Sequence, residues 1–92
     1  MILLLPGINN ARCENNNLKI ISDEKAECVY SISECTYEFS DGVKMTTRDN
    51  LDHFIAWNPD KTYYIKCKDK YGNQPLPNSC SIIVRPTKSY SN

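Results

Sequence analysis

The sequence contains a single histidine, His53, and this scarcity limits the chemistry that the chain can carry. A catalytic cysteine or serine needs a base as its partner, and a zinc site needs several ligands at close spacing. No Cys-x-x-Cys pair, Gly-x-Ser-x-Gly, phosphate loop or His-Glu-x-x-His is present. We therefore expect no enzymatic activity, no metal and no cofactor.

Neither sign of charge dominates, because eleven basic residues balance eleven acidic ones and neither sign forms a run longer than three. This balance argues against nucleic acid as a partner. The apolar run at residues 2–5 is too short for a secretory signal, which needs about 7–15 apolar residues, or for a membrane span of about 20. We expect no direct membrane insertion. We also expect an excised domain of a larger protein, and the sequence leaves open whether Met1 is native to it.

Five cysteines in 92 residues are many for so short a chain. Their number predicts disulfides and an oxidising compartment, which is extracellular or at the cell surface. A domain of this size buries only about two-thirds of its unfolded surface, so covalent links add needed stability. The odd count leaves at least one thiol outside the intrachain pairs.

Short apolar or alternating segments separated by turn residues predict strands throughout the chain. Residues 62–68 are the clearest case, with Tyr63, Ile65 and Cys67 on one face and Tyr64, Lys66 and Lys68 on a solvent-exposed face. Helical spacing within 46–57 leaves a helical turn there as an alternative. The predicted strands are 2–5, 18–21, 26–32, 37–39, 43–47, 52–56, 62–68 and 80–84.

These eight segments, of which 52–56 is the weaker, are one more than such a fold needs, and the pattern predicts an all-β, seven-stranded antiparallel sandwich. We expect one domain over residues 1–86, followed by a flexible C-terminal tail over 87–92. Residues 6–17, which begin with Pro6-Gly7 and are rich in asparagine, are expected to form a connection.

Two segments resemble fibronectin type III-like domains, a group of immunoglobulin-like sandwiches. Trp57-Asn-Pro59-Asp-Lys-Thr62-Tyr63 is similar to the turn Leu-x-Pro-x-Thr-x-Tyr, with Trp57 in place of leucine. The resemblance implies that Tyr63 packs inward and that its hydroxyl bonds nearby backbone, which closes one end of the sandwich.

The segment from Tyr63 to Asn73 resembles the next strand of that family and its Asp-x-x-Gly-Asn turn, formed here by Asp69 and Gly72. With residues 26–31, it resembles a cysteine-containing subgroup from bacterial and archaeal cell-surface proteins. The resemblance covers about residues 18–85.

The strand order of that family implies the disulfides. One cysteine on strand C and another on strand F favour a Cys28–Cys67 bond. Cys13 and Cys35 are expected at the opposite end of the sandwich, where they would form a second bond. Cys80 would then remain a free thiol, packed as a small apolar side chain.

Two groups of polar residues could be read as sites. Asp69 could be a calcium ligand, but one carboxylate does not supply the 6–8 oxygens that calcium takes, so we expect a structural Asx turn with Gly72 at positive φ. Asp49, Asp52 and His53 could be a metal or acid/base cluster. A lone histidine beside turn aspartates is expected instead at a solvated edge.

Binding is expected at the loop over residues 69–78, where Tyr71, Pro75, Leu76 and Pro77 combine apolar side chains with a stiff backbone. Leu76 could equally fold back over the end of the sandwich. We expect a structural or adhesive module whose partners are neighbouring domains of the same polypeptide and a protein or glycan ligand. The alternative is a small secreted ligand or inhibitor that acts through residues 69–78.

Overall fold

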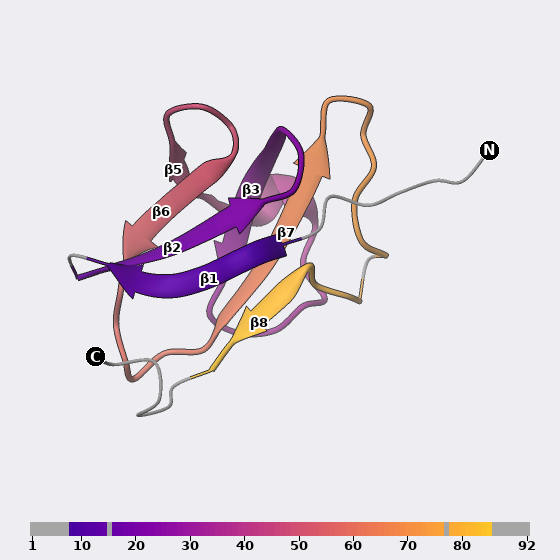
Figure 1. The fold of residues 1–92 in the computed structure, drawn as a ribbon. Helices are drawn as coiled ribbons and strands as arrows, with labels where there is room; N and C mark the ends of the chain where they lie inside the picture. The colour runs from indigo at the N-terminus through magenta and orange to yellow at the C-terminus, as the bar shows by residue number, and fades with distance from the viewer. Residues whose placement is uncertain (1–7, 15, 77, 86–92) are drawn as a thin grey trace.

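The computed structural model describes residues 8–14, 16–76 and 78–85, and these form two antiparallel sheets of four strands each (Figure 1). The strand orders are β1-β2-β6-β5 and β4-β3-β7-β8. The all-β class with disulfides is thus confirmed, with eight strands in place of seven. The predicted strand 2–5 and the predicted tail 87–92 lie outside the described residues.

The first sheet consists of β1 (Ile8–Glu14), β2 (Asn17–Ser22), β6 (Asp52–Ala56) and β5 (Thr46–Thr47). The second consists of β4 (Val43–Lys44), β3 (Ala26–Ser31), β7 (Tyr63–Asp69) and β8 (Ile82–Val84). In the described part of the chain, no helix has the length and apolarity to span a membrane.

Alternating residues of both sheets form one hydrophobic core. In β2, every second residue is buried, including Leu18 and Ile20. They join Cys28, Ile65 and Val84 of the second sheet. The period-two alternation seen in the sequence therefore marks the inner faces of the two layers.

Strand β1 occupies a segment that the sequence analysis assigned to a connection. Its residues pair with β2 from Ile8 opposite Ser22 to Glu14 opposite Asn17, so β1 and β2 form a hairpin with a turn at Asn16. Asn16 takes a positive φ of 66°, which asparagine tolerates better than most residues. The asparagine-rich sequence predicts a loop here, whereas Asn16 and Asn17 belong to a hairpin.

The predicted strand 43–47 is broken at Met45, which is buried. Val43 and Lys44 pair with β3, whereas Thr46 and Thr47 pair with β6 in the other sheet. The Met45 amide donates to the carbonyl of Cys28 at 2.9 Å. The chain thus crosses between layers at this residue, and one predicted strand becomes two, β4 and β5.

The connection over residues 32–42 covers the outer face of the second sheet, where the predicted strand 37–39 does not form. Phe39–Asp41 is a 3₁₀ turn, η1. The Tyr37 hydroxyl donates to the carbonyl of Tyr64 at 2.7 Å. A Cβ on Gly42 would lie 2.5 Å from Cγ2 of Val29, so glycine lets the connection approach the sheet.

Beneath this connection Lys66 is buried, although the alternation of β7 predicted a solvent-exposed position. Its Nζ donates to the carbonyl of Tyr37 at 2.7 Å and lies 4.6 Å from the centre of the Tyr37 ring. Burial lowers the pKa of Lys66, although the negative charge of Glu38 acts to raise it. Burial also raises the pKa of Tyr37 to about 12. The prediction failed because the periodicity of one strand does not reveal what covers its outer face.

The structure contains the predicted Cys28–Cys67 disulfide, between residues directly opposite each other on β3 and β7. The predicted Cys13–Cys35 bond is wrong, as is the free thiol at Cys80. Cys35 pairs with Cys80, and Cys13 is free. The 32–42 connection folds back over the sheet and carries Cys35 toward the segment before β8. The predicted neighbours of β7, β3 on one side and β8 on the other, are nevertheless present.

Replacing both cysteines of either disulfide by serine should lower the free energy of unfolding by about 2–5 kcal/mol. The two bonds span similar separations, 39 and 45 residues, so the chain-entropy contribution should be similar. Urea unfolding measures the loss, with Cys13→Ser as the matched control that removes no bond. Non-reducing peptide mapping that recovers a Cys13–Cys35 fragment would contradict the pairing.

Candidate functional site

Three connections meet at one end of the sandwich, which we call the loop end (Figure 1). They are residues 23–25 between β2 and β3, 48–51 between β5 and β6, and 70–81 between β7 and β8. The hairpin turn at Asn16 and the connection 57–62 lie at the other end, which we call the corner end. Loops held on a rigid scaffold are common binding elements, so the loop end is the candidate site.

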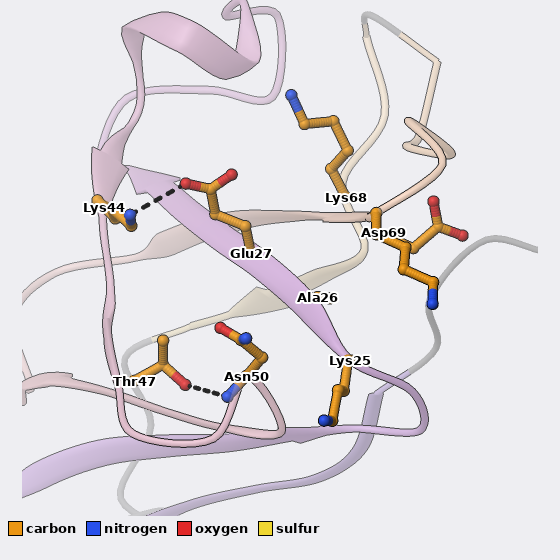
Figure 2. Close-up of a pocket in the computed structure, with 9 residues that line it drawn as sticks. Lys25, Ala26, Glu27, Lys44, Thr47, Asn50, Lys68 and Asp69 are labelled. Atoms are coloured by element: carbon orange, nitrogen blue, oxygen red, sulfur yellow. Dashed lines mark hydrogen bonds and ion pairs between the residues drawn. The ribbon is translucent and has the colours of Figure 1, made fainter.

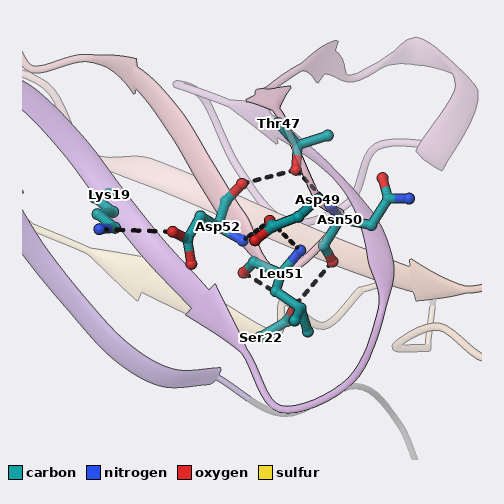
Figure 3. A network of polar contacts seen from close by, with 7 residues as sticks. All are labelled: Lys19, Ser22, Thr47, Asp49, Asn50, Leu51 and Asp52. Carbon is teal, nitrogen blue, oxygen red and sulfur yellow. Dashed lines mark hydrogen bonds and ion pairs between the residues drawn. The ribbon is translucent and has the colours of Figure 1, made fainter.

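The turn over residues 48–51 is fixed by side-chain hydrogen bonds (Figure 3). The Thr47 hydroxyl donates to the carbonyl of Asp52 at 2.7 Å and accepts from the Asn50 amide at 2.9 Å. An Asp49 carboxylate oxygen accepts from the amides of Asp52 at 2.9 Å and Leu51 at 3.0 Å. These backbone donors hold the pKa of Asp49 below its usual value.

The same turn is joined to both sheets. Its Asn50 carbonyl accepts from the Ala26 amide of β3, and its Leu51 carbonyl accepts from the Ser22 amide of β2, each at 2.9 Å. Asn50 has a positive φ of 63°. Because both layers hold the turn, the position of the Asn50 backbone at the loop end is set by the fold.

His53 lies in the core and not at a solvated edge, which corrects the sequence-based expectation. Its side chain is fully buried, and Nε2 lies 3.1 Å from the hydroxyl oxygen of Ser22, which is also buried. Burial lowers the pKa of His53, although the negative charges of Asp49 and Asp52 act to raise it. The prediction was wrong because it rested on the aspartates beside His53, which are typical of a turn. His53 points inward on β6 because it lies directly opposite Ile20, which is buried.

Asp69 forms the predicted Asx turn at the end of β7. One carboxylate oxygen accepts from the amides of Tyr71 and Asn73, each at 2.9 Å, and the other accepts from the Asn73 side chain at 2.8 Å. Gly72 takes a positive φ of 86°, as expected. Desolvation acts to raise the pKa of Asp69, but the hydrogen bonds outweigh it and hold the pKa below its usual value.

The predicted binding loop is partly exposed. Tyr71 is 78% and Leu76 71% exposed, so Leu76 does not fold back over the end of the sandwich. Pro75 is buried, and Pro77 lies outside the described residues. The structure therefore presents two apolar side chains of this loop to solvent.

Beside this loop lies a pocket of about 340 Å³ that the sequence analysis did not identify (Figure 2). Four lysines from different elements contribute to its lining, and no sequence motif brings them together. Its lining residues are Lys25, Ala26, Glu27, Lys44, Thr47, Asn50, Lys68, Asp69 and Lys70.

The corner end has the geometry that the family resemblance implied. Tyr63 is buried, and its hydroxyl donates to the carbonyl of Ala56 at 3.1 Å and accepts from the Asn58 amide at 2.9 Å. Trp57 stacks on Tyr63, with ring centres 5.4 Å apart. Pro59 is exposed within the connection that leads to β7. This corner closes the end of the sandwich opposite the candidate site.

The polar groups that the described residues bury differ from those that they expose at the loop end. Ser22 and His53 could form a nucleophile and base, but both are buried, so a substrate would not reach them. Across the described residues, no three histidine, cysteine, aspartate or glutamate side chains gather into a candidate metal site. The accessible groups at the loop end are ammonium, carboxylate, amide and aromatic groups.

Tyr63→Phe should lower the free energy of unfolding by about 1–3 kcal/mol, because the Asn58 amide and the Ala56 carbonyl lose their buried partner. Urea unfolding at neutral pH measures the change. Tyr71→Phe is the matched control, since Tyr71 is exposed. Equal unfolding midpoints for Tyr63→Phe and the unmodified chain would show that the hydroxyl does not stabilise the corner.

The burial of His53 predicts lower stability at acidic pH. The unfolded chain binds a proton near the ordinary histidine pKa of 6.5, whereas the folded chain binds it only at lower pH. Stability is therefore complete above pH 6.5 and falls as the pH decreases toward the folded pKa, at no more than about 1.4 kcal/mol per pH unit for one proton. Urea unfolding from pH 7.5 to 5 measures this dependence.

His53→Gln should flatten that dependence, since glutamine does not titrate. The difference between the two profiles separates the contribution of His53 from that of Glu24, because Glu24 is present in both proteins. The pKa of Glu24 is raised by desolvation and by Asp69. A raised carboxyl pKa has the opposite sign, because it adds stability at low pH. Parallel profiles for the two proteins would exclude His53 as the source.

No protein-family model, curated protein sequence or solved structure matches the chain. The structure shows that the described residues form two four-stranded antiparallel sheets with two disulfides.

Proposed function

We propose that the chain is a non-enzymatic binding module of the fibronectin type III-like kind, which acts in an extracellular surface protein and contacts its partner through the loop end. The observation that carries this proposal is the convergence of three connections at that end, with one turn hydrogen-bonded to both sheets. A rigid scaffold lowers the entropy cost of ordering a binding surface.

Three features support the family assignment. The Tyr63 corner and the strand neighbours of β7 agree with the resemblance in the sequence. The Cys28–Cys67 bond joins the strands that correspond to C and F, as in the cysteine-containing cell-surface subgroup. Two disulfides suit an oxidising compartment. Neighbouring domains of the same polypeptide and a protein or glycan ligand are the proposed partners.

The burial of Ser22 and His53 supports a non-enzymatic role, because it keeps the hydroxyl and the imidazole away from any substrate. The exposed Tyr71 and Leu76 instead provide apolar surface that a partner can contact. These same two side chains also favour the second candidate, a small secreted ligand or inhibitor that acts through residues 69–78. The two candidates differ in context, so the full-length gene product distinguishes them.

Microspheres coated with the domain test adhesion directly. We expect retention under flow on at least one surface of a panel of immobilised extracellular proteins and glycans. Tyr71→Ala combined with Leu76→Ala should reduce retention by about tenfold or more, as truncation of anchoring side chains does at interfaces. The matched control is Asp60→Ala with Lys61→Ala, two exposed residues at the corner end.

Retention no greater than that of uncoated microspheres on every surface would contradict the adhesive role. Loss of retention by the corner-end control, with the loop-end variant unaffected, would place the contact at the corner end and contradict the proposed site. Thermal unfolding of both variants confirms that the domain remains folded in each comparison.

A further inference from the structure

The pocket at the loop end has the dimensions of a small-ligand site. Its volume of about 340 Å³ falls at the lower end of the range of about 300–1,000 Å³ found for such sites. Ala26, which is buried, contributes to its lining from β3, and side chains from β4, the 48–51 turn and β7 surround it (Figure 2). A molecule of about one sugar ring fits this space.

The lining has a surplus of positive charge in a chain whose net charge is zero. Lys25, Lys44, Lys68 and Lys70 carry ammonium groups, whereas Glu27 and Asp69 carry carboxylates, which leaves two positive charges in excess. Partial exclusion of water from a concave surface strengthens the attraction between such charges and an anion. The pocket is therefore electrostatically suited to one anionic group.

The two carboxylates already have partners in the protein. Glu27 forms an ion pair with Lys44 at 3.1 Å. Asp69 accepts hydrogen bonds from Tyr71 and Asn73, so its charge is stabilised by the turn. Of the two acids that line the pocket, one is thus paired with a lysine and the other is held by the turn.

Among the four lysines, two are the better candidates for ligand contact. Lys44 forms an ion pair with Glu27, and Nζ of Lys68 lies 4.4 Å from the centre of the half-buried Phe39 ring. Nζ of Lys70 lies 5.2 Å from the centre of the Tyr71 ring, but that ring is exposed and leaves the ammonium group accessible. Lys25 and Lys70 are exposed and reach the pocket from the connections at 23–25 and 70–81. They stand on two different loops, so one anion between them would be contacted from both.

The Asn50 side chain adds hydrogen-bonding capacity beside these charges. The backbone of Asn50 is fixed by Thr47 and by Ala26, while its side chain is exposed at the pocket. Its amide group can both donate to and accept from the hydroxyl groups of a ligand. A polar molecule with hydroxyl groups and a negative charge matches this lining better than an apolar one.

We infer that this pocket binds a small polyhydroxylated ligand of about one sugar ring that carries one carboxylate, sulfate or phosphate group. Lys25 and Lys70 bind the anionic group, and Asn50 binds a hydroxyl. The inference rests on the proposed function for its choice of the loop end, and it adds the chemical class of the ligand. A surplus of only two charges in a confined pocket suits one anionic group and not a long polyanion.

Nuclear magnetic resonance titration of the ¹⁵N-labelled chain at low salt tests the ligand class. Glucuronate, glucose 6-sulfate and glucose 6-phosphate distinguish the three anionic groups, and at least one should give saturable shifts at the amides of Lys25, Asn50 and Lys70. Glucose should bind at least about tenfold more weakly, since it lacks the charge. Inorganic phosphate should also bind more weakly, since it lacks the ring.

Two results of this titration would overturn the inference. The first is the absence of saturable shifts with all three charged sugars. The second is binding of glucose or of inorganic phosphate as tight as that of the charged sugars, because the pocket would then not recognise the combination of charge and ring.

Lys25→Gln combined with Lys70→Gln should weaken binding of the charged sugar by at least about tenfold. Lys61→Gln is the matched control, because Lys61 is exposed at the corner end. Unchanged thermal midpoints show that the lysine variants remain folded. Unchanged affinity in the double variant, or equal loss in the control, would contradict the assignment of the two lysines.

The outcomes separate this inference from the proposed function. Retention of coated microspheres without binding of any charged sugar would reject the ligand class and leave the adhesive module intact. Binding of a charged sugar without retention on any surface would support the pocket and reject adhesion.

Discussion

The structure depends on the burial of β7 along both of its faces. On the inner face, Tyr63, Ile65 and Cys67 join the core between the sheets. On the outer face, the 32–42 connection places Tyr37 over Lys66, whose ammonium group finds a carbonyl acceptor and an aromatic ring. A buried ammonium group without such partners would be costly, so the connection and the strand stabilise each other.

This central strand also orients the two ends of the molecule. Tyr63 at its start forms the corner, and Asp69 at its end forms the turn that leads into the exposed loop. The disulfide from Cys67 to Cys28 joins β7 to β3, and the bond from Cys35 to Cys80 holds the covering connection near β8. A small domain thereby obtains a rigid frame without a large core.

The balance of charge over the whole chain conceals local differences. Lysines from three separate segments meet at the loop end, where only two carboxylates line the same pocket. Elsewhere, basic side chains cover aromatic rings: both Lys19 and Arg48 lie over Phe54 on the first sheet. Net charge therefore says little about what one end of this sandwich can bind.

Features that depend on a few adjacent residues could be predicted from the amino-acid sequence alone. The alternation around Ile65 predicts β7, the 57–63 segment predicts the Tyr63 corner, and Asp69 with Gly72 predicts the turn. In each case the local backbone and its nearest hydrogen bonds decide the structure. The Cys28–Cys67 bond was also predictable, because the family that the sequence resembles places the two strands side by side.

Other features arise from the three-dimensional fold, because they depend on the path of a long connection or on contacts between distant segments. The burial of Lys66 and the Cys35–Cys80 bond require residues 32–42 to fold back over the sheet, and periodicity carries no information about that path. His53 enters the core because β6 pairs with β2, although turn residues precede it. The lysine-lined pocket exists because three sequence-distant segments end at the same side of the sandwich.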